Sequence, residues 1–111
     1  MNNLMDFDGY KAAICYDPEI EMFRGEFVGL NGGADFYATN VEDLYKEGRQ
    51  SLQEFLQACE EEGIKPRKPY SGRLNLRIDP DLHEAVALKA AAKNQSLNQL
   101  INESIRQAIL L

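Results

Sequence analysis

Arg73-Leu74-Asn75-Leu76-Arg77-Ile78 alternates polar and apolar side chains without a break, and Asp79-Pro80 follows. A period of two is typical of a β-strand that buries one of its faces. The leucines and the isoleucine would lie on the buried face. The opposite face carries two guanidinium groups and one carboxamide, and it contains no carboxylate. The stretch therefore predicts a strand with an apolar side and a polar, partly basic side.

Two short helices are predicted after this strand. Pro80 suits the first position of a helix with Asp79 as its N-cap, and Ser96 suits the N-cap of a second helix. The apolar stripe of the second helix is Leu97, Leu100, Ile101, Ile105, Ala108 and Ile109. A lone strand has no pairing partner, and two helices of this length bury little surface by themselves. We therefore expect residues 73–111 to form a ribbon-helix-helix domain, a homodimer whose two strands pair antiparallel.

The polar face of the predicted ribbon carries side chains that recognise bases. Arginine pairs well with guanine edges, and asparagine with adenine edges, in the major groove of DNA. We expect Arg73, Asn75 and Arg77 to read an operator. The start of the second helix, at Ser96, Leu97 and Asn98, would bind phosphate, because a helix N-terminus is an anion site. The alternative is an ordinary edge strand whose polar side chains face water.

The preceding part of the chain predicts an α+β domain. Strands are expected over residues 10–16, 22–28 and 35–38, with turns at residues 17–19 and 31–33. A long helix would follow, because Thr39 and Glu42 have capping-box spacing and Gly63 is a helix terminator. Gly48 falls on its apolar face and would allow close approach to the sheet. Residues 1–63 are thus expected to form a three-stranded antiparallel sheet with one long helix, and residues 64–72 a linker.

The formal net charge of −6 is unevenly distributed. Residues 1–62 hold 14 acidic and 4 basic side chains, a net charge of −10, whereas residues 63–111 hold 4 acidic and 8 basic side chains, a net charge of +4. A basic segment suits nucleic acid, and an acidic body suits a basic partner or simply favours solubility. Asp17, Glu19 and Glu21, near the first hairpin turn, are the candidate contacts for such a partner; a solvated turn is the alternative.

Catalysis and cofactors are not expected. The two cysteines, Cys15 and Cys59, lie in apolar patterns without a metal-binding spacing, so buried reduced thiols are predicted, and His83 is expected on the surface. The acidic residues of the first domain fall mostly in turns or on a solvated strand face, and no histidine there would serve as a base. No apolar run is long enough to cross a bilayer, and no signal-peptide pattern follows Met1. We therefore expect a cytoplasmic protein.

The order and spacing of several short motifs make the chain resemble the HicB family of type II antitoxins from end to end. The motifs are Tyr10-Lys11-Ala12-Ala13-Ile14, Tyr16-Asp17, Phe23-Arg24-Gly25, Val28-Gly29-Leu30, Thr39-Asn40-Val41-Glu42-Asp43-Leu44, Cys59-Glu60-Glu61-Glu62-Gly63, Pro66-Arg67-Lys68-Pro69-Tyr70-Ser71-Gly72, Leu74-Asn75-Leu76-Arg77-Ile78, Asp81-Leu82-His83 and Ser96-Leu97-Asn98-Gln99. The resemblance implies a truncated ribonuclease-H-like domain that covers a small basic HicA-type mRNA-cleaving toxin. It also implies that the ribbon-helix-helix domain binds the operator of the shared operon.

Two other functions remain open from the sequence. The chain would be a transcription regulator without a toxin if its first domain senses a small ligand or mediates assembly. It would be a metal-dependent nuclease if the acidic residues converged on divalent cations. Whether ribbon-helix-helix dimers pair further is also left open.

Overall fold

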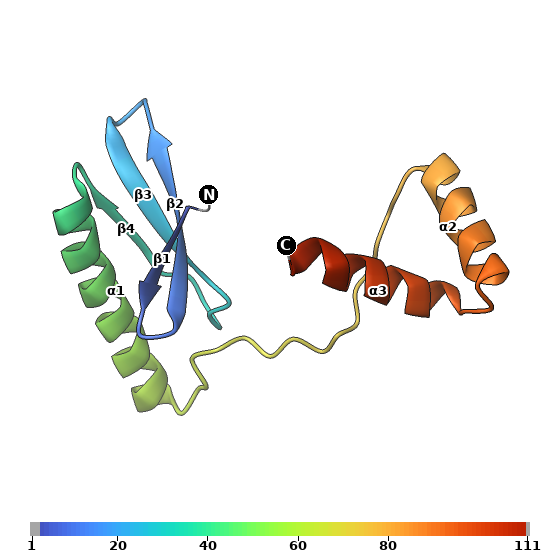
Figure 1. Ribbon diagram of the computed structural model, residues 1–111. Helices are drawn as coiled ribbons and strands as arrows, with labels where there is room; N and C mark the ends of the chain where they lie inside the picture. Colours follow the sequence, from blue (N-terminus) through green and yellow to red (C-terminus); the bar gives the residue numbers. More distant parts are fainter. Residues whose placement is uncertain (1–2, 111) are drawn as a thin grey trace. The chain divides into compact units, whose positions relative to one another are not determined.

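The computed structural model describes residues 3–110 and divides the chain into two compact units. We call Met1–Ser71 the sheet unit and Gly72–Leu111 the helical unit. The sheet unit combines one antiparallel sheet with the long helix α1, and the helical unit contains α2 and α3 (Figure 1). The fold class is α+β, as predicted.

The sheet has four strands, one more than the sequence analysis predicted. They follow one another in the order β1-β2-β3-β4, each antiparallel to its neighbour, and span Leu4–Phe7, Tyr10–Asp17, Met22–Val28 and Asp35–Ala38. The unpredicted strand is β1. It is joined to β2 by Asp8 and Gly9, which both have positive φ, 53° and 92°. An Asp-Gly pair between two strands is a strong hairpin signal, so the sequence did contain the evidence for β1.

Helix α1, Val41–Glu62, begins and ends at residues whose caps are visible in the structure. Its N-cap is Asn40 rather than Thr39, which the capping-box spacing had suggested. The Asn40 Oδ1 atom accepts a hydrogen bond from the Asp43 amide at 2.8 Å. Gly63 adopts a left-handed φ of 68°, and the Ile64 amide donates to the Cys59 carbonyl. The predicted C-terminal stop is therefore confirmed.

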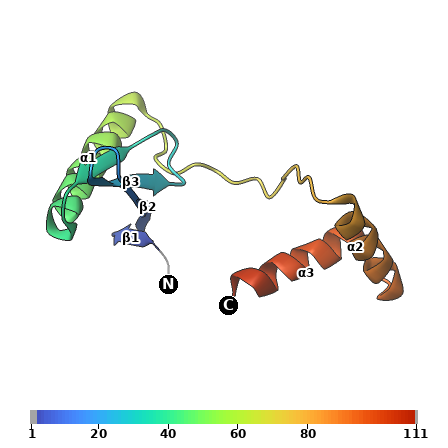
Figure 2. The same ribbon diagram turned by 90° about the horizontal axis from the view of Figure 1, so that it is seen from above.

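The core of the sheet unit lies between α1 and one face of the sheet, which we call the inner face (Figure 2). Its buried residues are Phe7, Ala12, Phe27, Leu30, Phe36, Ala38, Leu44 and Leu52. Gly48 lies where helix and sheet come closest, because a Cβ atom there would be only 2.4 Å from Cζ of Phe7. The close approach predicted for this glycine is confirmed.

Part of the predicted linker, residues 64–72, is held by the sheet unit. The Asn31 amide donates to the Pro66 carbonyl, and the Lys68 amide donates to the Gly29 carbonyl, both at 2.8 Å. The Arg67 guanidinium carbon lies 4.0 Å from the centre of the Tyr10 ring, within cation–π range. The first residues of the segment therefore belong to the sheet unit rather than to a free connection.

The helical unit consists of an irregular segment followed by two helices. Residues 73–79 of the single chain have no assigned strand or helix. Helix α2 spans Pro80–Ala92 with Asp79 at the N-cap, although the Asp79 side chain makes no capping hydrogen bond. Helix α3 spans Leu97–Ile109, and Asn94 in the intervening turn has a φ of 56°. Within the described residues, no helix is both long and apolar enough to span a membrane.

Candidate nucleic-acid and partner interfaces

The predicted base-reading residues Arg73, Asn75 and Arg77 are all exposed and lie along the irregular segment before α2. The apolar residues between them are exposed as well: Leu74 retains 74% and Leu76 56% of its accessible surface. A strand that buried one face within a single chain would not leave both leucines open to water. The ribbon itself is therefore not formed within one chain, and its pairing remains a prediction.

The helical unit leaves much of its apolar surface exposed. Among its described residues only Ala90 and Leu100 are buried hydrophobics. Its exposed large hydrophobic residues are Leu74, Leu76, Leu82, Leu88, Leu97, Ile105, Ile109 and Leu110. An open cavity of about 380 Å³ lies among Leu76, Arg77, Ile78, His83, Val86, Leu97 and Ile101. His83 is exposed, as predicted.

The start of α3 has the geometry of a complete capping box. The Gln99 amide donates to Oγ of Ser96 at 3.0 Å, and the Ser96 amide donates to Oε1 of Gln99 at 2.9 Å. The next two amides, of Leu97 and Asn98, belong to the first turn of the helix, where backbone N–H groups have no acceptor within the helix. Both residues are exposed, and their amides are the candidate phosphate-binding groups.

The acidic residues predicted to contact a partner lie together at the turn between β2 and β3. Glu19 and Glu21 are exposed and Asp17 is half-buried. Asp17 also has a structural role, because its Oδ1 atom accepts the Glu19 amide at 3.0 Å. Glu21 adopts a φ of 51°. The tip thus presents carboxylates on a well-defined turn.

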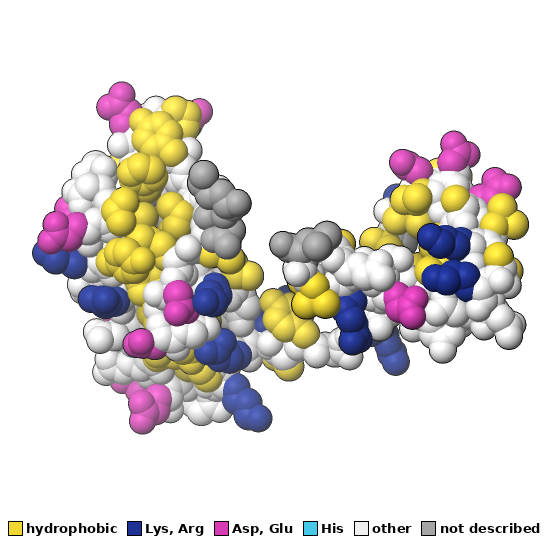
Figure 3. All heavy atoms as spheres, in the orientation of Figure 1, with side chains coloured by type: hydrophobic (Ala, Val, Ile, Leu, Met, Phe, Trp, Pro, Cys, Tyr) yellow, Lys and Arg dark blue, Asp and Glu magenta, His cyan; other side chains and the backbone are white. Residues whose placement is uncertain are grey.

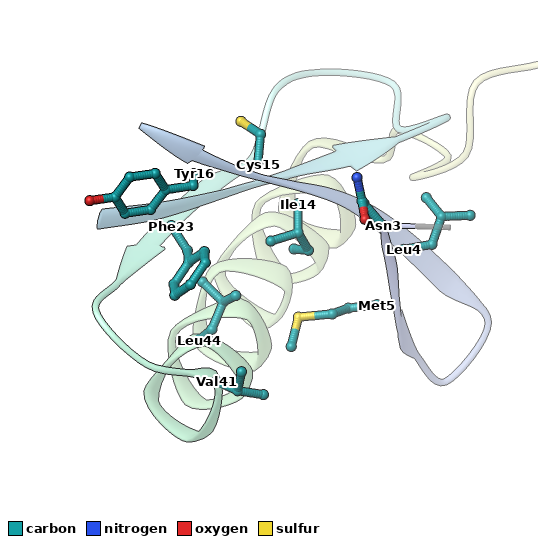
Figure 4. A pocket seen from close by; sticks show the side chains of 9 residues that line it. All are labelled: Asn3, Leu4, Met5, Ile14, Cys15, Tyr16, Phe23, Val41 and Leu44. Atoms are coloured by element: carbon teal, nitrogen blue, oxygen red, sulfur yellow. The ribbon is translucent and has the colours of Figure 1, made fainter. Parts of the chain in front are cut away.

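A groove that the sequence analysis did not predict opens beside this tip. It has a volume of about 360 Å³, and we call it the apolar groove. Its lining residues are Asn3, Leu4, Met5, Ile14, Cys15, Tyr16, Phe23, Val41 and Leu44 (Figure 4). Hydrophobic side chains form a continuous stripe on this side of the sheet unit (Figure 3). The available signal was the alternation in β2, which places Ile14 and Tyr16 on the same face as the buried Ala12.

The other face of the sheet, the outer face, is not covered by α1. Arg24 Nη2 lies 2.6 Å from Oδ2 of Asp35 and 3.8 Å from Oε2 of Glu26. The hydrogen bond to Asp35 raises the pKa of Arg24 further above its ordinary value. Lys11 lies 3.1 Å from Oδ1 of Asp6, and its hydrogen bond lowers the pKa of that carboxyl group. These carboxylates are thus engaged in surface ion pairs.

The cysteine prediction is half correct. Cys59 is buried in α1, as expected, but Cys15 is exposed. The neighbour of Ile14 in β2 must point to the opposite face, and that face is not covered by α1. Both thiols are free. Within residues 3–110, no three histidine, cysteine or acidic side chains are grouped so as to hold a metal ion.

Comparison with known proteins gives one match. The model of the HicB family matches residues 55–105, from the last two turns of α1 through the irregular segment and α2 into α3. Comparisons with curated proteins and with solved structures gave no match. The matched region contains Arg73, Asn75, Arg77 and the N-terminus of α3.

Proposed function

Because this chain belongs to the HicB family, we propose that it is the antitoxin of a type II toxin–antitoxin pair and represses its own operon. The sheet unit holds a small basic HicA-type toxin and blocks its cleavage of mRNA. The helical unit forms a ribbon-helix-helix homodimer on operator DNA. Both activities are binding functions, exerted in the cytoplasm without a cofactor.

The observation that carries the DNA-binding proposal is the exposed apolar side of the irregular segment. Leu74 and Leu76 alternate with Arg73, Asn75 and Arg77, and both leucines are more than half exposed in one chain. Pairing with a second copy would bury the leucines over the exposed residues of α2 and α3, which the hydrophobic effect favours. The polar side chains would then face outward from a two-stranded ribbon of a width that a major groove admits.

The toxin-binding proposal is supported by the charge of the sheet unit. Residues 1–71 hold 14 acidic and 7 basic side chains, a net charge of −7, which repels nucleic acid and attracts a basic protein. The carboxylates of the outer face are paired with Arg24 and Lys11, and none of the described residues forms a metal-binding group. A role in binding therefore fits this unit better than a role in catalysis.

The proposal expects the adjacent gene to encode a small basic toxin, and it is tested by expressing the product of that gene with and without this chain. We expect growth arrest by the neighbour alone, growth with both, and a stable complex on purification. A fragment of residues 1–71 should still protect, since the sheet unit includes the paired residues 65–68. Arrest that persists when the full chain is present would contradict the proposal and favour a regulator without a toxin.

The DNA-binding activity is tested by separating base recognition from phosphate binding. Asn75→Ala should reduce the preference for the operator over random DNA, because a good bidentate base contact contributes about 1–3 kcal/mol of discrimination. Ser96→Ala should weaken binding to both DNAs more evenly, through the phosphate contacts and the lost cap. Affinities are measured at one salt concentration, since phosphate binding is strongly salt-dependent. An unchanged preference in a folded Asn75→Ala dimer would contradict the proposed base contact.

A further inference from the structure

We propose that the apolar groove of the sheet unit is the toxin's docking surface, where apolar side chains of the toxin insert and its basic side chains pair with the acidic rim. This inference rests on the proposed function and adds the surface through which the partner is held. It involves Met5, Ile14, Tyr16, Phe23 and Val41, none of which was predicted to contact a partner.

The groove exists because one helix does not cover the inner face of a four-stranded sheet. Strands lie about 4.8 Å apart, so the sheet is wider than a helix of about 10 Å diameter. Gly48 brings the middle of α1 close to Phe7 in β1. Toward the N-terminus of α1, Val41 and Leu44 face Met5, Ile14 and Phe23 across the open groove (Figure 4).

The groove exposes large apolar side chains at its margins. Tyr16 retains 55% and Val41 59% of its accessible surface, and Ile14, Phe23 and Met5 are only partly buried. The Tyr16 and Phe23 rings stack edge to face, 5.6 Å apart, which gives the groove a preformed aromatic wall. Contiguous apolar surface with a polar rim is characteristic of a protein-binding site.

Acidic residues follow two of the lining residues, Tyr16 and Val41, along the chain. Glu19 and Glu21 are exposed in the turn after β2, and Glu42 and Asp43 follow Val41 in the first turn of α1, whereas Asp17 belongs to the outer face by alternation. The cations Lys11 and Arg24 belong to the outer face by strand alternation, away from the groove. An apolar centre with a rim of a single charge sign fits a partner that combines apolar side chains with lysine or arginine.

The same charges disfavour two other occupants. A second copy of this chain, related by a two-fold axis, would place the acidic rim against itself, because a two-fold interface pairs the same patch on both subunits. Like charges held opposite one another oppose association. Nucleic acid would be repelled by the carboxylates as well.

The test compares two full-length variants that each gain two positive charges. Tyr16→Lys/Val41→Lys changes the groove at two positions that are more than half exposed, so the fold should persist. Ala13→Lys/Val28→Lys adds the same charge to exposed positions of the outer face and serves as the matched control. The probe is the purified product of the adjacent gene, in a variant that no longer arrests growth. Calorimetry measures its affinity, and thermal unfolding verifies that both variants fold.

We expect the groove variant to bind the probe about 100-fold more weakly, since central interface side chains often contribute tenfold or more each. The control variant should stay within about threefold of the wild type, and both should bind promoter DNA normally. If Tyr16→Lys/Val41→Lys is poorly folded, Val41→Lys alone should still weaken binding by about tenfold.

Three outcomes would overturn the inference. If the groove variant and the wild type bind the probe with equal affinity, the groove is not the docking surface, while the proposed antitoxin function still stands. A wild-type chain that does not bind the probe would overturn both proposals. The wild-type chain could also form an assembly larger than a dimer in the absence of toxin. If the groove substitutions reduce that assembly to a dimer, the groove binds a second copy of the chain instead.

Discussion

At the scale of single residues, Gly48 gives the sharpest prediction because its effect should have the opposite sign from that of an ordinary helical glycine. In a solvated helix, Gly→Ala stabilises by about 1 kcal/mol. Here the new Cβ would meet the buried Phe7 ring at 2.4 Å, and overpacking typically costs about 1–3 kcal/mol. We expect Gly48→Ala to lower the free energy of unfolding, measured in urea. Gly33→Ala, where the Cβ meets nothing within 4 Å, is the control. If Gly48→Ala raised the free energy of unfolding, α1 and β1 would be less closely packed than the structure shows.

At the scale of elements, two substitutions test which residue caps the start of α1, Asn40 or Thr39. Asn40→Ala should lower the free energy of unfolding by about 0.5–2 kcal/mol, because the Asp43 amide loses its acceptor. Thr39→Ala should change it by less than about 0.5 kcal/mol, since Thr39 is exposed and lies before the cap. Urea denaturation of both variants measures the difference. If Thr39→Ala were the more costly substitution, the helix would begin one residue earlier than the structure shows.

At the scale of the whole molecule, Leu76 tests whether the helical unit is completed by a second chain. An exposed leucine can be replaced by alanine at little cost, whereas a buried one contributes about 2–5 kcal/mol. Leu76 is 56% exposed in one chain, so a large effect requires burial by a partner. We expect Leu76→Ala to shift sedimentation from dimer to monomer or to unfold this unit, and Asn75→Ala to leave the dimer intact. A fragment of residues 71–111 that sediments as a folded monomer would contradict dimerisation.

Local patterns were sufficient to predict most elements of this chain. β3 and β4 have the predicted bounds, β2 extends one residue further, to Asp17, and α1 ends at its predicted glycine. These features depend on alternation, capping and φ, which a few neighbouring residues determine. β1 is as short as β4, which was predicted, and it was missed because the Asp-Gly turn signal was not used. The signal for β1 was the Asp8-Gly9 turn. Because β1 forms one wall of the apolar groove, the groove could not be predicted without it.

The sequence by itself determined the α+β class, the helical pair after the 73–78 segment, and the division into an acidic and a basic part, because composition and periodicity express these directly. Only the tertiary structure decided that Cys15 is exposed, that residues 65–68 pair with the sheet unit, and that Met5, Ile14, Phe23 and Val41 line one groove. Each of these depends on where α1 crosses the sheet. That crossing is set by packing between residues far apart in the chain, such as Gly48 against Phe7, and no local pattern encodes it.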